Sequence, residues 1–110
     1  MEYRVEILMA TYNGEKYLSE QIESIISQTY TEWNLLVRDD GSSDNTCVIL
    51  TEYEKKDSRI KIIKDNKGNL GIVKNFEELL HNSSSEFIMF SDQDDVWKKD
   101  KIEIMMKYIG

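Results

Sequence analysis

The feature that most constrains the fold of this chain is a fourfold alternation of short apolar runs with segments of helical periodicity. The apolar runs are expected strands and lie at residues 4–9, 33–37, 60–63 and 87–90. After each run, apolar residues recur at the spacing of a helix that packs one face on a core. This order predicts an α/β domain with a mainly parallel, Rossmann-like sheet covered by helices on both faces. The expected inward positions are Leu18, Ile22, Ile25, Ile26 and Thr29, then Val48, Ile49 and Tyr53, then Val73, Phe76 and Leu80, and last Ile102, Met105, Met106 and Ile109.

Length and composition fit one domain that covers residues 1–110. The formal net charge of -7 argues against a nucleic-acid backbone or an anionic membrane surface as the main partner. The single cysteine, Cys47, rules out an internal disulfide and is typical of a reducing compartment. No apolar run approaches the roughly 20 residues that span a bilayer, and no signal-peptide pattern is present. We therefore expect a soluble, cytoplasmic protein that does not bind nucleic acid.

Polar clusters follow three of the four expected strands. Thr11 and Tyr12 come after the first, Asp39 and Asp40 after the second, and the acidic segment 92–95 after the fourth. In open parallel sheets, ligands bind beyond the carboxyl ends of the strands, where the strand order reverses. We expect these clusters to meet at one edge of the sheet.

The segment FSDQDDVW at residues 90–97 crowds three carboxylates into four positions. A close like-charge pair costs about 4 kcal/mol at 4 Å and an effective dielectric constant near 20. The side chains must splay into water, share a proton or surround a cation. In the simplest reading, Asp94 or Asp95 only caps a helix that begins near Trp97. A cap needs one oxygen, however, and three carboxylates favour a site for Mg²⁺ or Mn²⁺.

The loop that begins at Asp39 has two interpretations. Its Asp, Gly and Ser residues are typical of a turn, with Asp44 as the N-cap of the next helix. Alternatively, one of its carboxylates accepts a hydrogen bond from an imide, an amine or a sugar hydroxyl of a ligand. Tyr12 is either a half-buried turn residue or a platform on which a base stacks, a contact worth about 1–3 kcal/mol. Residues alone leave both choices open.

Three other α/β classes fit the pattern poorly. Phosphotransfer receivers and Asp-x-Asp phosphatases place their acidic pair after the first strand, whereas here the pairs follow the second and the fourth. A dinucleotide oxidoreductase needs G-x-G-x-x-G after the first strand, and residues 12–14 do not supply it.

Five segments carry a resemblance to a known family. In chain order they are MATYNGEKYL, SIISQTY, VRDDGSSDNT, GNLGIVKNF and FSDQDDVW. Together they resemble the nucleotide-binding half of inverting family 2 glycosyltransferases with the GT-A fold, over essentially the whole chain. The segment SDQDDVW is most similar to the corresponding segment of transferases of the rhamnosyltransferase, capsule or O-antigen type.

The resemblance implies a role for residues at two strand ends. Thr11, Tyr12 and Glu15 match the loop that lines the nucleotide pocket of the family. Asp40 matches the position that reads the base, usually uracil or thymine, and Asp39 stands beside it.

It also implies a metal site built on the Asp-x-Asp pair. Asp92 matches the residue that approaches the ribose, and Asp94 matches the ligand of the Mn²⁺ or Mg²⁺ ion that bridges the diphosphate. Asp95 extends this metal-binding cluster, where it orients a bound water or caps a helix. Lys74 matches a residue that supports the nucleotide or its phosphates, and it reads equally well as a solvated helix lysine.

The activity implied is transfer of a sugar from a UDP- or dTDP-linked donor to a saccharide or lipid-linked acceptor in cell-surface polysaccharide synthesis. Members of the family often act as peripheral proteins at the inner membrane face. This sequence departs from the family in having Ala10 where proline is usual. It also stops at Gly110, before the acceptor half that supplies the general base, so we expect a truncated domain whose catalytic base lies beyond Gly110. The alternative is a non-catalytic module that binds nucleotide or forms a homo-oligomer through the surface left by the missing half.

Overall fold

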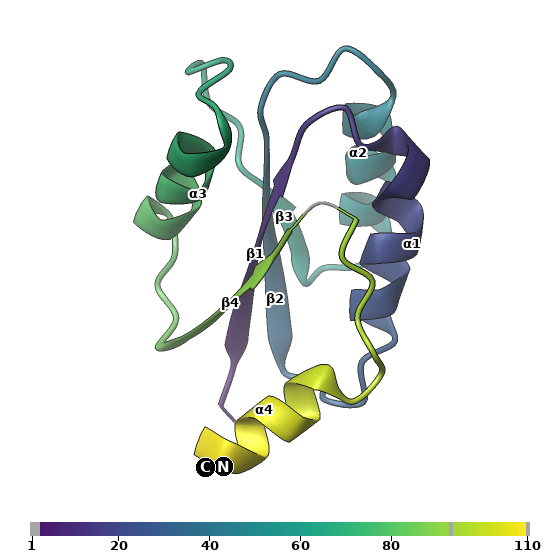
Figure 1. Ribbon diagram of the computed structural model, residues 1–110, viewed down its shortest axis with the longest axis vertical. Coiled ribbons are helices and arrows are strands. Elements are labelled where there is room, and N and C mark those ends of the chain that lie inside the picture. Colours follow the sequence, from purple (N-terminus) through teal and green to yellow (C-terminus); the bar gives the residue numbers. More distant parts are fainter. Residues whose placement is uncertain (1–2, 93, 110) are drawn as a thin grey trace.

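A parallel four-stranded sheet forms the centre of the protein, in a computed structural model that describes residues 3–92 and 94–109 (Figure 1). The order of the strands is β3-β2-β1-β4, and every pair is parallel. Helices alternate with the strands along the chain, as the periodicity predicts. The elements are β1 (Val5–Thr11), α1 (Glu15–Ile26), β2 (Trp33–Asp39), α2 (Thr46–Lys56), β3 (Ile60–Ile62), α3 (Ile72–His81), β4 (Phe87–Ser91) and α4 (Lys101–Ile109).

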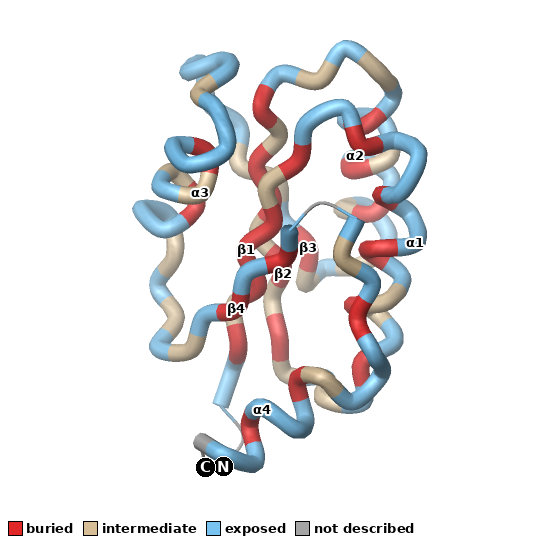
Figure 2. The backbone as a smooth tube through the Cα atoms, in the orientation of Figure 1, coloured by how far each residue is buried: buried red, intermediate tan, exposed pale blue. Residues whose placement is uncertain are grey.

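The helices cover both faces of the sheet. In Figure 1, α1 and α2 lie together on one face, α3 covers the other, and α4 lies near the amino ends of the strands. The main core fills the space between the sheet and α1 and α2, around fully buried side chains such as Ile7, Leu35 and Ile22 (Figure 2). Burial of β1 and β2 on both faces explains their apolar runs at residues 7–10 and 35–37. The predicted parallel α/β fold is confirmed.

Helix α2 is rotated relative to the predicted face. Val48 was expected inside, yet it is 57% exposed, whereas Leu50 is fully buried. Ile49 is half-buried against the core, and Tyr53 is buried as predicted. The inward face begins with the polar Thr46, whose Oγ1 accepts a hydrogen bond from the Gly14 N–H at 2.9 Å. A pattern built on apolar residues alone could not find that face.

Helix α3 also turns a different side inward. Val73 and Leu80 were expected to be buried, but they are 70% and 44% exposed. The buried residues are Asn75 and Leu79. Asn75 faces a buried arginine and exchanges hydrogen bonds with it, so a polar residue occupies the centre of the inward face. The apolar side chains of this helix are therefore divided between the core and the surface.

The remaining differences lie at element ends. Helix α1 ends before Thr29, and Met105 of α4 is 44% exposed, although Ile102 and Met106 are buried as predicted. The side chain of Ile109 and the whole of Gln93 lie outside the described residues. Over residues 3–92 and 94–109, no helix combines the length and the apolar character that a membrane crossing requires.

Helix caps differ in detail from the prediction. The N-cap position of α2 is Asn45 rather than Asp44. Asp44 still serves that end, because its carboxylate accepts the Thr46 N–H at 3.0 Å. Helix α4 begins at Lys101 and not near Trp97, so the alternative interpretation of Asp94 or Asp95 as the cap of a helix near Trp97 is wrong.

Candidate functional site

A pocket of about 270 Å³ lies at the carboxyl ends of β1, β2 and β4, against α3. Strand β1 has β2 on one side and β4 on the other, so the pocket lies where the strand order reverses. Four residues expected at the site, Thr11, Tyr12, Asp40 and Asp92, line it together. We call it the switch-point pocket. Its lining is Ala10, Thr11, Tyr12, Asp40, Ile72, Asn75, Phe76 and Asp92.

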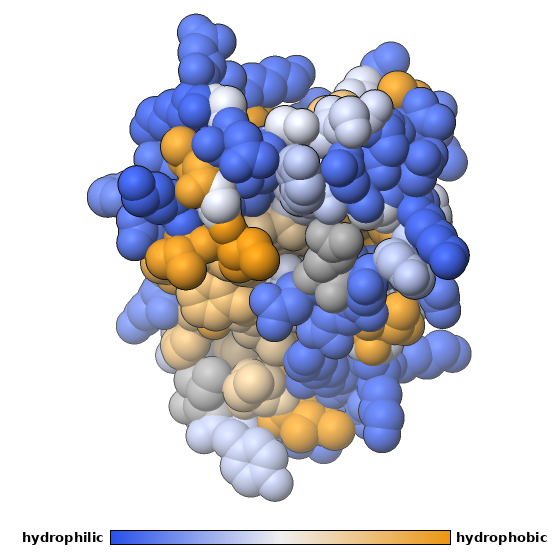
Figure 3. Space-filling view, turned by 45° about the horizontal axis from the view of Figure 1, so that its top comes forward, coloured by the Kyte–Doolittle hydropathy of each residue, from blue (hydrophilic) through white to orange (hydrophobic). Residues whose placement is uncertain are grey.

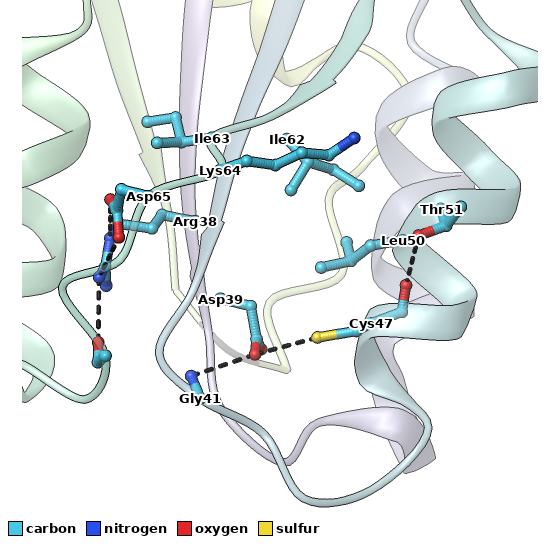
Figure 4. Close-up of a pocket in the computed structure, with 11 residues that line it drawn as sticks. Arg38, Asp39, Gly41, Cys47, Leu50, Thr51, Ile62, Ile63, Lys64 and Asp65 are labelled. Atoms are coloured by element: carbon cyan, nitrogen blue, oxygen red, sulfur yellow. Dashed lines mark hydrogen bonds and ion pairs between the residues drawn. The ribbon is translucent and has the colours of Figure 1, made fainter.

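Neighbouring carboxylates at the end of β2 point to opposite faces of the sheet. Side chains alternate along a strand, so Asp39 and Asp40 cannot share a side. Asp40 lines the switch-point pocket, whereas Asp39 points toward Cys47 in a second cavity of about 370 Å³ (Figure 4). The structure therefore does not bring Asp39 into the pocket with the other expected nucleotide-binding residues.

Asp39 instead fixes the loops that frame the pocket. One of its oxygens accepts the hydroxyls of Thr11 and Ser42 at 2.8 and 2.6 Å. The other accepts the backbone N–H groups of Ser42 and Gly41 and the thiol of Cys47. Burial alone would raise the pKa of Asp39, but the hydrogen bonds from Ser42, Thr11 and Cys47 outweigh it and hold that pKa below its usual range. Asp39 is thus an ionised anchor for Thr11 at the pocket wall.

The two loops at this edge are also joined directly. The backbone N–H of Asn13 donates to Ser42 Oγ at 2.7 Å, and Asn13 Oδ1 accepts the Ser43 N–H at 2.8 Å. The N–H of Glu15 donates to Asp44 at 3.2 Å. These contacts fix the β1–α1 loop, which carries Tyr12, against the β2–α2 loop.

Asp40 is 4% exposed and its carboxylate already has three donors. Oδ1 accepts Arg38 Nη1 at 3.0 Å and the Leu70 N–H at 2.7 Å, and Oδ2 accepts the Gly71 N–H at 2.9 Å. A carboxylate offers about four acceptor positions. Asp40 therefore retains capacity for one further donor from a ligand in the pocket that it lines.

Arg38 is a site residue that sequence reasoning missed. It is 2% exposed, and it contacts Asp40, Asp65, Asn75 and the carbonyl oxygen of Gly68. Its available signal was a charged residue directly after a buried apolar strand run, where burial requires a charged partner. The partners themselves are distant in sequence, so no local pattern names them.

The three carboxylates that follow β4 all lie among the described residues and form no cluster in the structure. Asp92 and Asp94 are exposed, and Asp94 has a φ of 69°. Asp95 is turned aside, because its Oδ2 accepts Trp97 Nε1 at 3.0 Å and lies 3.9 Å from Lys101 Nζ. Within the described part of the chain, no three His, Cys, Asp or Glu side chains converge on a metal position.

The donors that remain suit a hard cation. Asp92 lines the switch-point pocket, and the exposed carboxylate of Asp94 follows two residues later. Magnesium commonly takes one or two protein carboxylates and completes its shell with phosphate oxygens and water. Asp92 and Asp94 have the chemistry that this requirement asks for, and the metal roles of Asp92, Asp94 and Asp95 all stay predictions.

Glu15 and Lys74 occupy matching places on two helices. Both are exposed, Glu15 in the first turn of α1 and Lys74 in the first turn of α3. Neither is among the described residues that line the switch-point pocket. Their expected contacts with nucleotide or phosphate stay predictions.

We expect the thiol of Cys47 to alkylate slowly although the residue is exposed. Burial of the thiol group, its hydrogen bond to Asp39 and the charges of Asp39 and Asp44 raise its pKa to about 11. At pH 8 only about one thiol in a thousand is then a reactive thiolate. Asp39→Asn should speed modification by iodoacetamide roughly tenfold, as followed by mass spectrometry. Asp100→Asn is the control, and a wild-type rate equal to that of a short cysteine peptide would contradict the expectation.

The sequence matches a known family over nearly its whole length. A family model described as Glycosyl transferase family 2 matches residues 6–110. Over 107 residues, the chain is 41% identical to the UDP-Glc:alpha-D-GlcNAc-diphosphoundecaprenol beta-1,3-glucosyltransferase WfgD of Escherichia coli, covering 96% of this chain and 40% of that protein. It is also 42% identical over 99 residues to the dTDP-rhamnosyl transferase RfbG of Shigella flexneri, covering 86% and 34% respectively. The chain thus spans well under half the length of these relatives.

Solved structures share the fold. The crystal structure of S. aureus TarS 1-349 in complex with UDP-GlcNAc superposes with a TM-score of 0.87 at 29% identity, covering 96% of this chain and 31% of that one. A mannosyltransferase from Pyrobaculum calidifontis superposes with a TM-score of 0.89 at 19% identity, covering 100% and 33%. The GT-A architecture expected from the sequence is confirmed.

Proposed function

The chain belongs to glycosyl transferase family 2, and from that premise we propose that it binds the nucleotide of a UDP- or dTDP-linked sugar donor. The sugar is passed to a saccharide or lipid-linked acceptor in polysaccharide synthesis at the cell surface. The observation that carries the proposal is the switch-point pocket, which Thr11, Tyr12, Asp40 and Asp92 line from three strand ends. The printed names of WfgD and RfbG, a UDP-Glc and a dTDP-rhamnosyl transferase, support it.

The chemistry of Asp40 favours one class of base. Its open acceptor position can take only a donor, and uracil and thymine present an imide N–H at the corresponding edge. Cytosine presents a lone pair there, which a carboxylate repels. Tyr12, 46% exposed beside the pocket, offers a face for stacking worth about 1–3 kcal/mol. We therefore expect UDP and dTDP to bind better than CDP.

The diphosphate lies, in this proposal, toward Asp92 and Asp94. These carboxylates would hold a Mn²⁺ or Mg²⁺ ion, which supplies positive charge against the charge that builds on the departing diphosphate. Lys74, exposed in the first turn of α3, would add a cation near the end of the helix that carries the pocket residues Ile72, Asn75 and Phe76. Transfer is a single displacement at the anomeric carbon with inversion. We assign the general base that deprotonates the acceptor to a region that the longer relatives have and that residues 1–110 do not cover.

Calorimetric titration with UDP, dTDP and CDP, each with and without Mn²⁺, tests the proposal. We expect wild-type protein to bind UDP or dTDP in a Mn²⁺-dependent manner, and Asp94→Ala to lose roughly tenfold in affinity in the presence of Mn²⁺. Asp100→Ala, which removes an exposed carboxylate outside the pocket, should bind like the wild type. Absence of binding by every nucleotide under every condition would refute the proposal.

A second candidate function is association with another copy of the chain. Strand β4 is an edge strand without a charged residue, and apolar side chains gather on the α3 side of the molecule (Figure 3). Such unprotected edges and patches promote pairing. A concentration-dependent dimer without nucleotide affinity in the same samples would favour this candidate over the first. The exposed apolar residues of α3 and β4 that would form this contact are Ile72, Val73, Leu80, Ile88 and Phe90.

A further inference from the structure

We propose that Arg38 and Asp65 are positioning residues for the carboxylate of Asp40, and that they set the base selectivity of the switch-point pocket without lining it. The inference rests on the proposed nucleotide-binding function and adds to it two residues outside the pocket. Asp65 and Arg38 line the second cavity instead, at its end away from α2 (Figure 4). Asp65 therefore acts on a nucleotide only through the arginine.

The guanidinium of Arg38 has no spare donor. Its Nε and Nη2 groups donate to the two oxygens of Asp65 at 2.9 and 3.1 Å, a bidentate pair. Nη2 also donates to the Gly68 carbonyl oxygen at 3.0 Å. Nη1 donates to Asp40 Oδ1 at 3.0 Å and to Asn75 Oδ1 at 2.9 Å. All five N–H groups have acceptors, and together these hydrogen bonds fix the plane of the guanidinium. The plane in turn fixes the position of Asp40 Oδ1, which accepts from Nη1.

The segment between β3 and α3 closes the arrangement from the other side. Arg38 holds its beginning through Asp65, and Asp40 holds its end by accepting the backbone N–H groups of Leu70 and Gly71. Gly71 has a φ of 86°, a left-handed conformation that glycine adopts without strain. The segment leads directly into α3, so these contacts also set the position of the opposite pocket wall.

Charge makes Asp65 important for the orientation of Asp40. The hydrogen bonds from Arg38 hold the pKa of Asp65 below its usual range, so Asp65 is ionised at neutral pH. Without Asp65, the guanidinium keeps only one carboxylate partner and can rotate toward it. The hydrogen bond from Arg38 Nη1 to Asp40 Oδ1 then changes direction. The open acceptor position of Asp40 that faces the pocket changes direction with it.

The experiment compares Asp65→Ala with Lys64→Ala, a neighbour in the same cavity whose side chain is 79% exposed. UDP and CDP are titrated calorimetrically, and amide hydrogen exchange of Leu70 and Gly71 is measured by NMR without nucleotide. We expect Asp65→Ala to lower UDP affinity about tenfold, to narrow the ratio of UDP to CDP affinity and to speed exchange at both amides. Asp65→Glu should partly restore the UDP affinity, the affinity ratio and the slow amide exchange. Lys64→Ala should leave all three at their wild-type values.

Three outcomes would overturn the inference. The first is Asp65→Ala with wild-type UDP affinity, and the second is unchanged exchange at Leu70 and Gly71. The third is an equal loss for UDP and CDP that follows the folded fraction measured by circular dichroism, since that marks a purely structural role. If wild-type protein binds neither nucleotide, the proposed function fails separately, and the exchange comparison still decides whether Asp65 positions the segment.

Discussion

Replacing Arg38 by glutamine is expected to lower the free energy of unfolding by about 3–5 kcal/mol, the usual cost of removing one partner from a buried ion pair. Asp40, 4% exposed, would lose the guanidinium that donates to its carboxylate. The carbonyl oxygen of Gly68 and the amide oxygen of Asn75 would lose their donors as well. Urea denaturation followed by tryptophan fluorescence measures the effect.

Arg59→Gln is the matched control. Arg59 lies 3.7 Å from the centre of the Trp33 ring and pairs with Asp57 at 2.8 Å, but its side chain is 27% exposed. Exposed ion pairs and cation–π contacts contribute about 1 kcal/mol or less each. Combining Arg38→Gln with Asp40→Asn should cost less than the sum of the single changes, because the isolated charge is then gone. A loss below about 1 kcal/mol for Arg38→Gln would mean that the buried guanidinium does not hold this edge of the sheet.

The order of elements could be predicted because each strand and helix has a local signal. Period-two and period-3.6 patterns depend only on near neighbours, and parallel pairing follows from the helices that connect successive strands. The end of β2 was placed two residues early, since Arg38 and Asp39 resemble loop residues. They remain in the strand because β1 continues beside them, with Ala10 and Thr11 as their partners in the ladder.

The residues that gather at the pocket could be predicted for the same reason. The carboxyl ends of parallel strands share an edge, and this brings Thr11, Asp40 and Asp92 together. The separation of Asp39 from Asp40 was not predicted, because the expected strand ended at Val37 and side chains alternate regularly only within a strand. The contacts of Arg38 were not readable, since Asp65 and Asn75 lie 27 and 37 residues away. Only the folded sheet brings those groups within hydrogen-bonding distance.

The face that α2 turns inward can be tested by two substitutions. Leu50→Ala removes a fully buried side chain from the core and should cost about 2–5 kcal/mol. Val48→Ala changes a side chain that is 57% exposed and should stay within about 0.5 kcal/mol of the wild type, because alanine also favours the helix. Urea denaturation of both variants gives the comparison. If both variants lost a similar free energy of unfolding, α2 would instead turn inward the face that apolar periodicity predicts. The expected contrast would show that α2 turns Leu50, and not Val48, toward the core, on the helix whose Thr46 is tied to Gly14 at the sheet edge.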